Sequence, residues 1–371
     1  MDDTIEFVNH QSSIELQSIL PLTMTMTTTT PPRRVFLISV PRSASHLLLK
    51  IVDIHNQPKF LTNEQGGYFF FPAFAPAIHG GYADKPLNEW TDAQKEEIKA
   101  SFHGCVSSLE EYSERAQKAD KAMFIKEHAY WFMNPAVMYE LMTGKEDPEL
   151  FKTFQLRLSE NSYGPNSFSS SNKTVLPDEY LRSWQVAFII RHPALAWASM
   201  YRAMTKIKSF GGMGDKEFMG VWKTNTTLRW TRMVYDWCLE QQGAQPVLID
   251  ADDVTHNPAA VKRFCELTGL DPEKMQYEWS EEKVKGTGPG MHDTENEHYE
   301  MQIKINCVMR STVDASSGIV KDKTPSGPID VAVEVEKWKD EFGDEAAQLL
   351  HEAVLESMPD YEYLKERRIV V

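Results

Sequence analysis

An arginine, two serines and a histidine lie close together near the start of the sequence, in RVFLISVPRSASHLLLKIV (34–52). An apolar run typical of a buried strand is followed by Pro41, Arg42, Ser43, Ala44, Ser45 and His46, and then by a run typical of a helix. Small residues at such a turn let backbone N–H groups converge on an anion, while hydroxyls and a guanidinium add charge-assisted hydrogen bonds. The turn therefore predicts a phosphate or sulfate site. The alternative is an ordinary helix with Ser43 or Ser45 as its N-cap.

A lysine and a histidine stand two residues apart at the end of a second apolar run (122–126). Residues i and i+2 of an extended segment point the same way, so Lys126 and His128 can share one site. A cation beside an imidazole suits a general base that faces an anionic leaving group. The alternative is a surface lysine and a loop histidine that serves only local hydrogen bonding.

A third apolar run (185–190) ends at Arg191, and Ser199 follows eight residues later on a predicted helix. An arginine at a strand end and a hydroxyl on the next helix can together bind a second phosphate. The alternative is an arginine paired with one of the many carboxylates. His192 precedes a proline and is interpreted as a turn residue without chemistry.

Two other stretches carry charge. Asp250, Asp252 and Asp253 follow the fourth apolar run (246–250) without a recognisable metal-ligand spacing, so capping of the next helix and pairing with arginine or lysine are expected. Lys285 and Gly286 belong to a Gly-rich stretch (281–293) that either wraps backbone around a phosphate or forms a surface turn.

The four apolar runs are separated by helical patterns at 92–119, 194–208 and 259–267. Strands that alternate with helices predict an α/β fold with a mainly parallel sheet, in which ligands bind beyond the carboxyl ends of the strands. Residues 1–31 show no sustained pattern and are expected to form a mobile arm. Residues 32–371 are expected to form a single domain, with surface loops at 161–174 and 314–328.

Composition narrows the classes of function. The formal net charge is -15, which argues against a protein that coats nucleic acid or anionic membrane. No apolar run reaches the roughly 18 residues of a membrane span, and the acidic N-terminus is unlike a signal peptide. The four cysteines show no C-x-x-C spacing, which predicts reduced thiols and a cytoplasmic location.

Taken together and in this order, the motifs between residues 34 and 290 resemble the sulfotransferases that use 3'-phosphoadenosine 5'-phosphosulfate (PAPS). The turn 41–46 stands where that family has P-[KR]-S-G-[ST]-[ST], with Ala44 and His46 in place of a glycine and a hydroxyl residue. Lys126 and His128 match its K-x-H motif, and LIDADDVTHNP (248–258) is similar to its strand ending in YEDL. The late K-G loop matches too, but lacks the aspartate-tryptophan pair usual in the family.

The resemblance implies a three-layer, P-loop-like fold with helical insertions, and transfer of a sulfuryl group from PAPS to a hydroxyl or amine. His128 would be the general base, assisted by Arg42 and Lys126, and no metal would be needed. The implied cofactor contacts are Arg42, Ser43, Ala44, Ser45 and His46 at the 5'-phosphosulfate, and Arg191, Ser199, Lys285 and Gly286 at the 3'-phosphate. The product would be 3',5'-diphosphoadenosine.

The acceptor is expected to be a small hydrophobic molecule of the secondary-metabolite kind, because the segments 66–76 and 128–132 are rich in aromatic residues. Those segments can equally be core. Sulfation that triggers elimination or cyclisation, and a non-catalytic nucleotide-binding relative, stay open as alternatives. A nucleotide kinase is disfavoured because the sequence lacks G-x-x-x-x-G-K-[ST]. A homodimer is compatible with the sequence.

Overall fold

The computed structural model describes residues 34–82, 85–242, 246–279, 297–320 and 325–371. The chain divides into two units after Pro31, and every described element belongs to the second unit. The predicted arm (1–31) and the predicted cofactor residues Lys285 and Gly286 lie outside the described residues.

Five parallel strands form one sheet in the order β2-β3-β1-β4-β5. They are β1 (Arg34–Ser39), β2 (Phe60–Leu61), β3 (Ala122–His128), β4 (Gln185–Ile190) and β5 (Val247–Asp250). The four predicted apolar runs form four of these strands, because continuous apolar sequence suits strands buried on both faces. Strand β2 is too short to leave a sequence pattern. The predicted α/β fold with a parallel sheet is confirmed.

Helices connect the strands and extend the fold beyond β5. They are α1 (Ser45–Ile51), α2 (Phe71–His79), α3 (Asp92–Lys118), α4 (Pro135–Thr143), α5 (Pro148–Thr153), α6 (Glu160–Tyr163), α7 (Asp178–Arg182), α8 (Pro193–Ser209), α9 (Asp215–Asn225), α10 (Arg229–Gln242), α11 (Ala251–His256), α12 (Pro258–Thr268), α13 (Glu297–Asp314), α14 (Val331–Phe342) and α15 (Asp344–Lys365). Short 3-10 helices are η1 (Ile54–Asn56), η2 (Leu87–Glu89), η3 (Ala129–Phe132) and η4 (Pro272–Lys274). The three predicted helices correspond to α3, α8 and α12, each within one residue at either end.

The predicted surface loop 161–174 is only partly correct. Its first residues belong to α6, and Asn172 and Thr174 are buried. The Asn172 amide donates to Asp178 Oδ1 at 2.7 Å and to the carbonyl of Leu176 at 2.8 Å. A serine- and asparagine-rich composition therefore led to the wrong exposure here, because these side chains satisfy buried polar groups. The described part of the other predicted loop, 314–328, has no helix or strand after Asp314.

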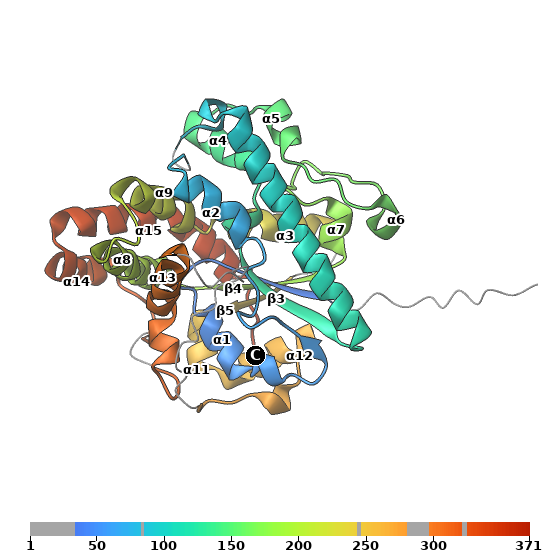
Figure 1. Ribbon diagram of the computed structural model, residues 1–371. Helices are drawn as coiled ribbons and strands as arrows, with labels where there is room; N and C mark the ends of the chain where they lie inside the picture. Colours follow the sequence, from blue (N-terminus) through green and yellow to red (C-terminus); the bar gives the residue numbers. More distant parts are fainter. Residues whose placement is uncertain (1–33, 83–84, 243–245, 280–296, 321–324) are drawn as a thin grey trace, which may run out of the picture. The chain divides into compact units, whose positions relative to one another are not determined.

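The sheet is the middle of three layers. Helices α1, α11 and α12 cover one face, where Leu37 of β1 shares a buried cluster with Leu48 and Phe264. Helices α3, α8, α10 and α15 lie on the other face, where Phe36 shares a second cluster with Trp197. Figure 1 shows the sheet between these two groups of helices. The predicted three-layer arrangement is confirmed.

The carboxyl ends of the central strands bring the predicted motifs to one edge. In the parallel register of β1 and β3, Ser39 stands opposite His128, and Leu37 stands opposite Lys126. The turn 41–44 follows β1 directly, and Arg191 follows the last residue of β4. Strands β1, β3 and β4 therefore deliver three separated stretches of sequence to the same place.

A short extended segment, 66–68, runs beside the end of β3. Lys126 N donates to the carbonyl of Gly66 at 2.8 Å, and Tyr68 N donates to the carbonyl of Lys126 at 2.9 Å. Asn63 holds the segment through its amide, which bonds both Gly67 N and Gly67 O. A Cβ on Gly67 would lie 1.9 Å from the carbonyl oxygen of Lys126, so only glycine fits. This close approach places Tyr68 at the end of β3.

Within the described ranges, none of the helices combines the length and apolar character that a membrane span requires. The same residues contain no group of three or more histidine, cysteine or carboxylate side chains arranged to hold a metal ion. All four cysteines are free thiols.

We expect Gly67→Ala to lower the free energy of unfolding by roughly 2–3 kcal/mol, because the new methyl group overlaps the backbone of β3. Gly104→Ala is the matched control, since Gly104 lies on α3 with open space around its Cβ position. It should raise the stability by about 0.5–1 kcal/mol through helix propensity. Urea unfolding of both variants measures the difference, and equal effects would mean that segment 66–68 does not pack on β3.

Candidate active site

The turn after β1 has an unusual backbone. Arg42 and Ala44 both adopt positive φ, 67° and 65°, which residues other than glycine rarely do. Ala44 is the N-cap of α1 and provides no side-chain cap, so neither Ser43 nor Ser45 is the capping residue of the alternative interpretation. Left-handed residues in a tight turn direct neighbouring N–H groups into a concavity that suits anions. The backbone therefore has the form that an anion site needs.

The side chain of Ser43 lies inside this turn. It is fully buried, and its hydroxyl has no hydrogen-bond partner among the described residues. A buried hydroxyl without a partner carries a desolvation cost. An anion bound in the turn would offer such a hydroxyl an acceptor.

Arg42 is the meeting point of the predicted phosphate residues. Its Nε donates to Ser199 Oγ at 2.9 Å, and its Nη1 donates to the carbonyl of Met309 in α13. Arg191 Nη1 donates to the main-chain oxygen of Arg42 at 3.0 Å. Ser199 and Arg191, which the sequence predicts as a pair, are thus brought together on Arg42.

Two buried arginines, Arg42 and Arg191, place positive charge at this turn. The side-chain partners of Arg42 are a hydroxyl and a carbonyl, both neutral. Burial lowers the pKa of Arg42, and burial together with repulsion from Arg42 lowers the pKa of Arg191 to about 10. Asp250 partly offsets the charge of Arg191, but its own oxygens accept from Asp252 N and from the hydroxyl of Tyr361. A bound anion would relieve this repulsion.

His128 is held by Ser39 across the β1–β3 pair. Ser39 Oγ lies 3.0 Å from Nδ1 of His128 and 3.1 Å from the main-chain oxygen of Glu127. The carbonyl can only accept, so the single hydroxyl hydrogen of Ser39 points to it, and Nδ1–H then donates to Oγ. This arrangement leaves the lone pair on Nε2. Burial, followed by the positive charge of Lys126, lowers the pKa of His128 well below its usual value.

Lys126, His46 and Tyr68 form a second cluster beside His128. His46 Nε2 lies 3.0 Å from Lys126 Nζ and 3.0 Å from the hydroxyl of Tyr68. The lysine nitrogen also lies 4.2 Å from the centre of the Tyr68 ring, a cation–π distance. Lys126 has 0% exposed surface. Burial, with the charge of Arg310 second, lowers its pKa, and burial and then Lys126 lower the pKa of His46.

Glu127 lies between Lys126 and His128 in sequence but points to the other face of β3. One of its oxygens accepts from the backbone N–H of Phe69, and the other has no partner in the described part of the chain. Burial raises the pKa of Glu127 to about 8. The carboxyl group therefore holds the segment that carries Tyr68 and contributes little negative charge to the neighbouring cations at neutral pH.

The carboxylates after β5 behave as expected. Asp250 caps α11 by accepting from Asp252 N at 2.9 Å. Asp253 pairs with Arg368 at 3.0 Å. His192 caps α8 through its own ring nitrogen, as a turn residue would.

Ser39 and Arg310 were not predicted from the sequence, whereas Tyr68 and Trp131 were expected only as members of aromatic segments that line a pocket or form core. Ser39 had a signal, because it is a polar residue in an apolar run, and Tyr68 had one in the two glycines before it. Arg310 of α13, which donates to Gln65 Oε1 at 3.3 Å and pairs with Asp314 at 3.0 Å, lies far from every motif in the sequence. Trp131, whose ring centre is 4.5 Å from that of His128, was grouped only with the aromatic segments.

A cavity of about 160 Å³ opens at His128 and is called here the His128 cavity. Its lining includes four aromatic rings and four methionines, together with polar side chains: Tyr68, Phe71, Phe74, Trp131, Met200, Met204, Met213 and Met309, and His46, Gln65, Glu217, Asn225, Asn306 and Arg310. Flexible, polarisable methionines adapt to apolar ligands of irregular shape. A ligand in this cavity would therefore lie against these rings and methionines, beside the imidazole of His128.

No family model matches the sequence. The chain is 33% identical over 350 residues to sulfotransferase ppzF of Metarhizium rileyi, covering 91% of this chain and 96% of that protein. It is 32% identical over 354 residues to sulfotransferase ppzF of Metarhizium majus, covering 91% and 97%. The chain belongs to the sulfotransferase family.

Two solved structures are similar at lower identity. A sulfotransferase domain from the curacin biosynthetic pathway is 13% identical, with a TM-score of 0.37, over 84% of this chain and 97% of that one. A sulfotransferase domain from the Synechococcus PCC 7002 olefin synthase is 14% identical, with a TM-score of 0.33, over 76% and 95%. Scores this low carry no weight beside the Metarhizium relatives.

Ala44 stands where the sulfotransferase motif has a glycine, and the geometry of the turn shows how alanine is accommodated there. The turn still takes the left-handed conformation that a glycine adopts freely, with φ 65° and ψ 18°. A left-handed residue with a Cβ costs roughly 1–2 kcal/mol. The chain therefore keeps the backbone shape of the turn and tolerates its strain.

We expect Ala44→Gly to raise the free energy of unfolding by roughly 0.5–1 kcal/mol, because relief of the strain exceeds the larger chain entropy of glycine. Ala100→Gly is the matched control on the exposed side of α3. There the same substitution should lower stability by about 1 kcal/mol. Urea unfolding gives both values, and a loss of stability in Ala44→Gly would show that the turn is not left-handed in solution.

Proposed function

We propose that this protein transfers a sulfuryl group from PAPS to a hydroxyl or amine of a small, largely apolar acceptor. PAPS would supply the activated sulfuryl group. The observation that carries the proposal is the placement of the left-handed turn 41–44, with its excess of positive charge, directly beside His128 across the β1–β3 pair. An anion-binding turn next to a base and an apolar cavity is what transfer from an anionic donor requires.

The residues present fit the donor. Arg42, Ser43 and the backbone of Ala44 and Ser45 would bind the 5'-phosphosulfate, and the buried hydroxyl of Ser43 would gain an acceptor. Arg191 and Ser199 would select the 3'-phosphate through their shared contact with Arg42. Lys285 and Gly286 complete the proposed set.

His46, predicted as part of the turn, lies in the first turn of α1, and its Nε2 is 3.0 Å from Lys126 Nζ. We therefore assign it an indirect contribution to the cofactor site, by holding the lysine. With its pKa lowered by burial, Lys126 can take up a proton when an anion arrives and then donate to the leaving phosphate. Arg42 and the turn N–H groups would stabilise negative charge as it develops.

His128 would act as the general base. The contact with Ser39 leaves the lone pair on Nε2, and the imidazole lies in the wall of the His128 cavity. Nε2 would accept the proton of the acceptor hydroxyl or amine as the bond to sulfur forms. Ser39 would be a positioning residue, because it acts only through the imidazole.

Calorimetric titration with 3',5'-diphosphoadenosine, ATP and AMP tests the donor. We expect tight binding of the diphosphate alone, and Arg191→Ala should weaken it at least about 10-fold by removing a charge-assisted contact. Arg263→Ala is the control, because Arg263 is exposed and pairs with Glu266 on α12. ATP binding as tight as that of the diphosphate would contradict PAPS use. No detectable binding of any of the three nucleotides would favour a non-catalytic relative.

His128→Asn should lower kcat for sulfuryl transfer about 100-fold or more, with the affinity for 3',5'-diphosphoadenosine changed less than about 3-fold. His103→Asn, on an exposed position of α3, is the control. A base with a lowered pKa stays unprotonated to lower pH, so kcat/KM for PAPS should fall only below the ordinary histidine range.

Ser39→Ala should shift the pH at which kcat/KM falls on the acidic side, and it should lower kcat without altering nucleotide affinity. An unchanged pH profile in Ser39→Ala would remove its positioning role.

A further inference from the structure

A second cavity lies behind the wall of the His128 cavity. It measures about 50 Å³ and is lined by rings from four parts of the chain, including Trp90, Phe102, Tyr130 and Trp230. We call it the aromatic cavity. Phe74 of α2 and Trp131 of η3 line both cavities, with their ring centres 5.9 Å apart. These two rings are therefore the partition between the two spaces.

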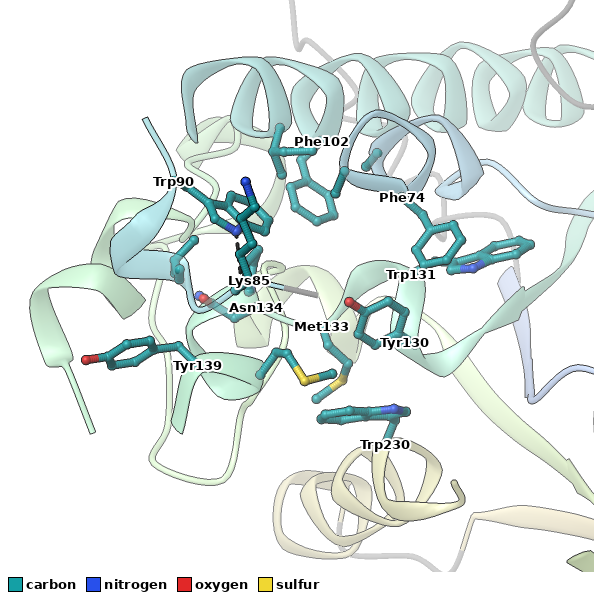
Figure 2. Close-up of a pocket in the computed structure, with 16 residues that line it drawn as sticks. Phe74, Lys85, Trp90, Phe102, Tyr130, Trp131, Met133, Asn134, Tyr139 and Trp230 are labelled. Carbon is teal, nitrogen blue, oxygen red and sulfur yellow. Dashed lines mark hydrogen bonds between the residues drawn. The ribbon is translucent and has the colours of Figure 1, made fainter. Parts of the chain in front are cut away.

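Figure 2 shows how the aromatic cavity is arranged. Phe74 and Trp131 lie together at one end, and Trp90, Lys85 and Tyr139 lie at the other. Tyr130 lies between the ends, with its hydroxyl oxygen directed into the cavity. The aromatic cavity therefore extends from the rings of Phe74 and Trp131 away from the His128 cavity.

The lining of the aromatic cavity includes one buried donor that matters for a ligand. The indole N–H of Trp131 is buried and has no hydrogen-bond partner in the described ranges. Asn134, by contrast, is fully engaged, since it accepts from Ala136 N and donates to the carbonyl of Phe151. The indole of Trp230 is likewise engaged with the carbonyl of Thr224 at 2.8 Å. A ligand that brings a hydrogen-bond acceptor to the indole N–H of Trp131 would give this buried donor a partner.

The sizes of the two cavities indicate how a ligand would occupy them. A dry cavity of about 150 Å³ holds one benzene ring. The His128 cavity, at about 160 Å³, is thus suited to a single ring beside the imidazole. The aromatic cavity is too small for a second ring of that size but suits a short arm of a few atoms. Phe74 is half-buried and lines both spaces, so an arm that passes from one to the other requires its ring to turn.

We propose that the aromatic cavity binds the distal arm of the acceptor, and that this arm carries a hydrogen-bond acceptor such as a carbonyl oxygen. The inference rests on the proposed function in seating the reactive hydroxyl at His128. Trp131 donates to the arm, Phe74 admits it, and the length of the arm determines which acceptors bind. The acceptor class is then a small ring bearing a hydroxyl and, opposite it, a short carbonyl-containing chain.

Calorimetry with three phenols on the full chain tests this without requiring turnover. The probes are 4-methylphenol, 4-(4-hydroxyphenyl)butan-2-one, and 4-(3-methylbutyl)phenol, which has the shape of the ketone but lacks its carbonyl. We expect the ketone to bind at least about 10-fold more tightly than 4-methylphenol, and about 3–10-fold more tightly than its hydrocarbon analogue.

Met138→Trp fills the aromatic cavity from a half-buried position on α4. It should weaken the ketone about 10-fold and change 4-methylphenol less than about 2-fold. Met142→Trp is the matched control on the same helix, since Met142 is 42% exposed and lines neither cavity. If the two variants affect the ketone equally, the arm does not enter the aromatic cavity and the inference is wrong.

Trp131→Phe keeps a ring in the partition but removes the donor, and it decides the matter if Met138→Trp does not fold. It should reduce the preference for the ketone over its hydrocarbon analogue to about 1-fold. Trp230→Phe is its control, because that indole already has a partner. An unchanged preference in Trp131→Phe would overturn the inference. Binding of the ketone as expected, with no sulfuryl transfer, would instead overturn the proposed function and leave this inference standing.

Discussion

The parallel pairing of β1 with β3 is the constraint on which the rest of the site depends. Its register sets Ser39 opposite His128, and the chain leaves β1 straight into the turn that carries Arg42 and Ser43. A shift of one residue would move Lys126 and His128 to the face where Glu127 now points. The buried runs of both strands resist such a shift, because each has a core cluster on either face. Apolar packing in the sheet thus fixes the distance between a base and an anion-binding turn.

Excess positive charge is the second physical feature of this edge. Arg42 and Arg191 are buried in contact with each other, and burial lowers the pKa of both. Asp250 is the carboxylate that acts on Arg191, and its oxygens already accept from Asp252 N and from the hydroxyl of Tyr361. The free protein carries the cost of this arrangement, and an anionic ligand that binds only the folded state recovers it as added stability. A chain with a net charge of -15 can therefore still bind a polyanion at one place.

Much of the fold could be predicted because its central strands are continuous apolar runs and its long helices have clear ends. The edge strand β2 could not be, since two residues carry no periodicity. At the site, Arg42, Lys126, His128, Arg191 and Ser199 stand at strand ends or on the next helix, where local sequence is informative. The contact of Ser199 with Arg42 and the approach of Arg310 from α13 depend on packing between distant helices, which no local pattern encodes. Asn172 was predicted to lie in a surface loop but is buried, because composition does not reveal its internal hydrogen-bond partner Asp178.

Ala44 and His46, which replace a glycine and a hydroxyl residue of the sulfotransferase motif, have different physical consequences. Ala44 keeps the backbone shape and adds strain, whereas His46 changes which groups surround Lys126. A hydroxyl at position 46 could not reach as far as an imidazole, whose Nε2 lies 3.0 Å from both Lys126 and Tyr68. Tyr68 is available there only because Gly67 lets its segment run against β3. His46, Lys126, Tyr68 and Gly67 therefore form one interdependent unit, in which the imidazole would lose a partner if the segment beside β3 were displaced. His46 and Gly67, twenty-one residues apart, therefore depend on each other through Tyr68.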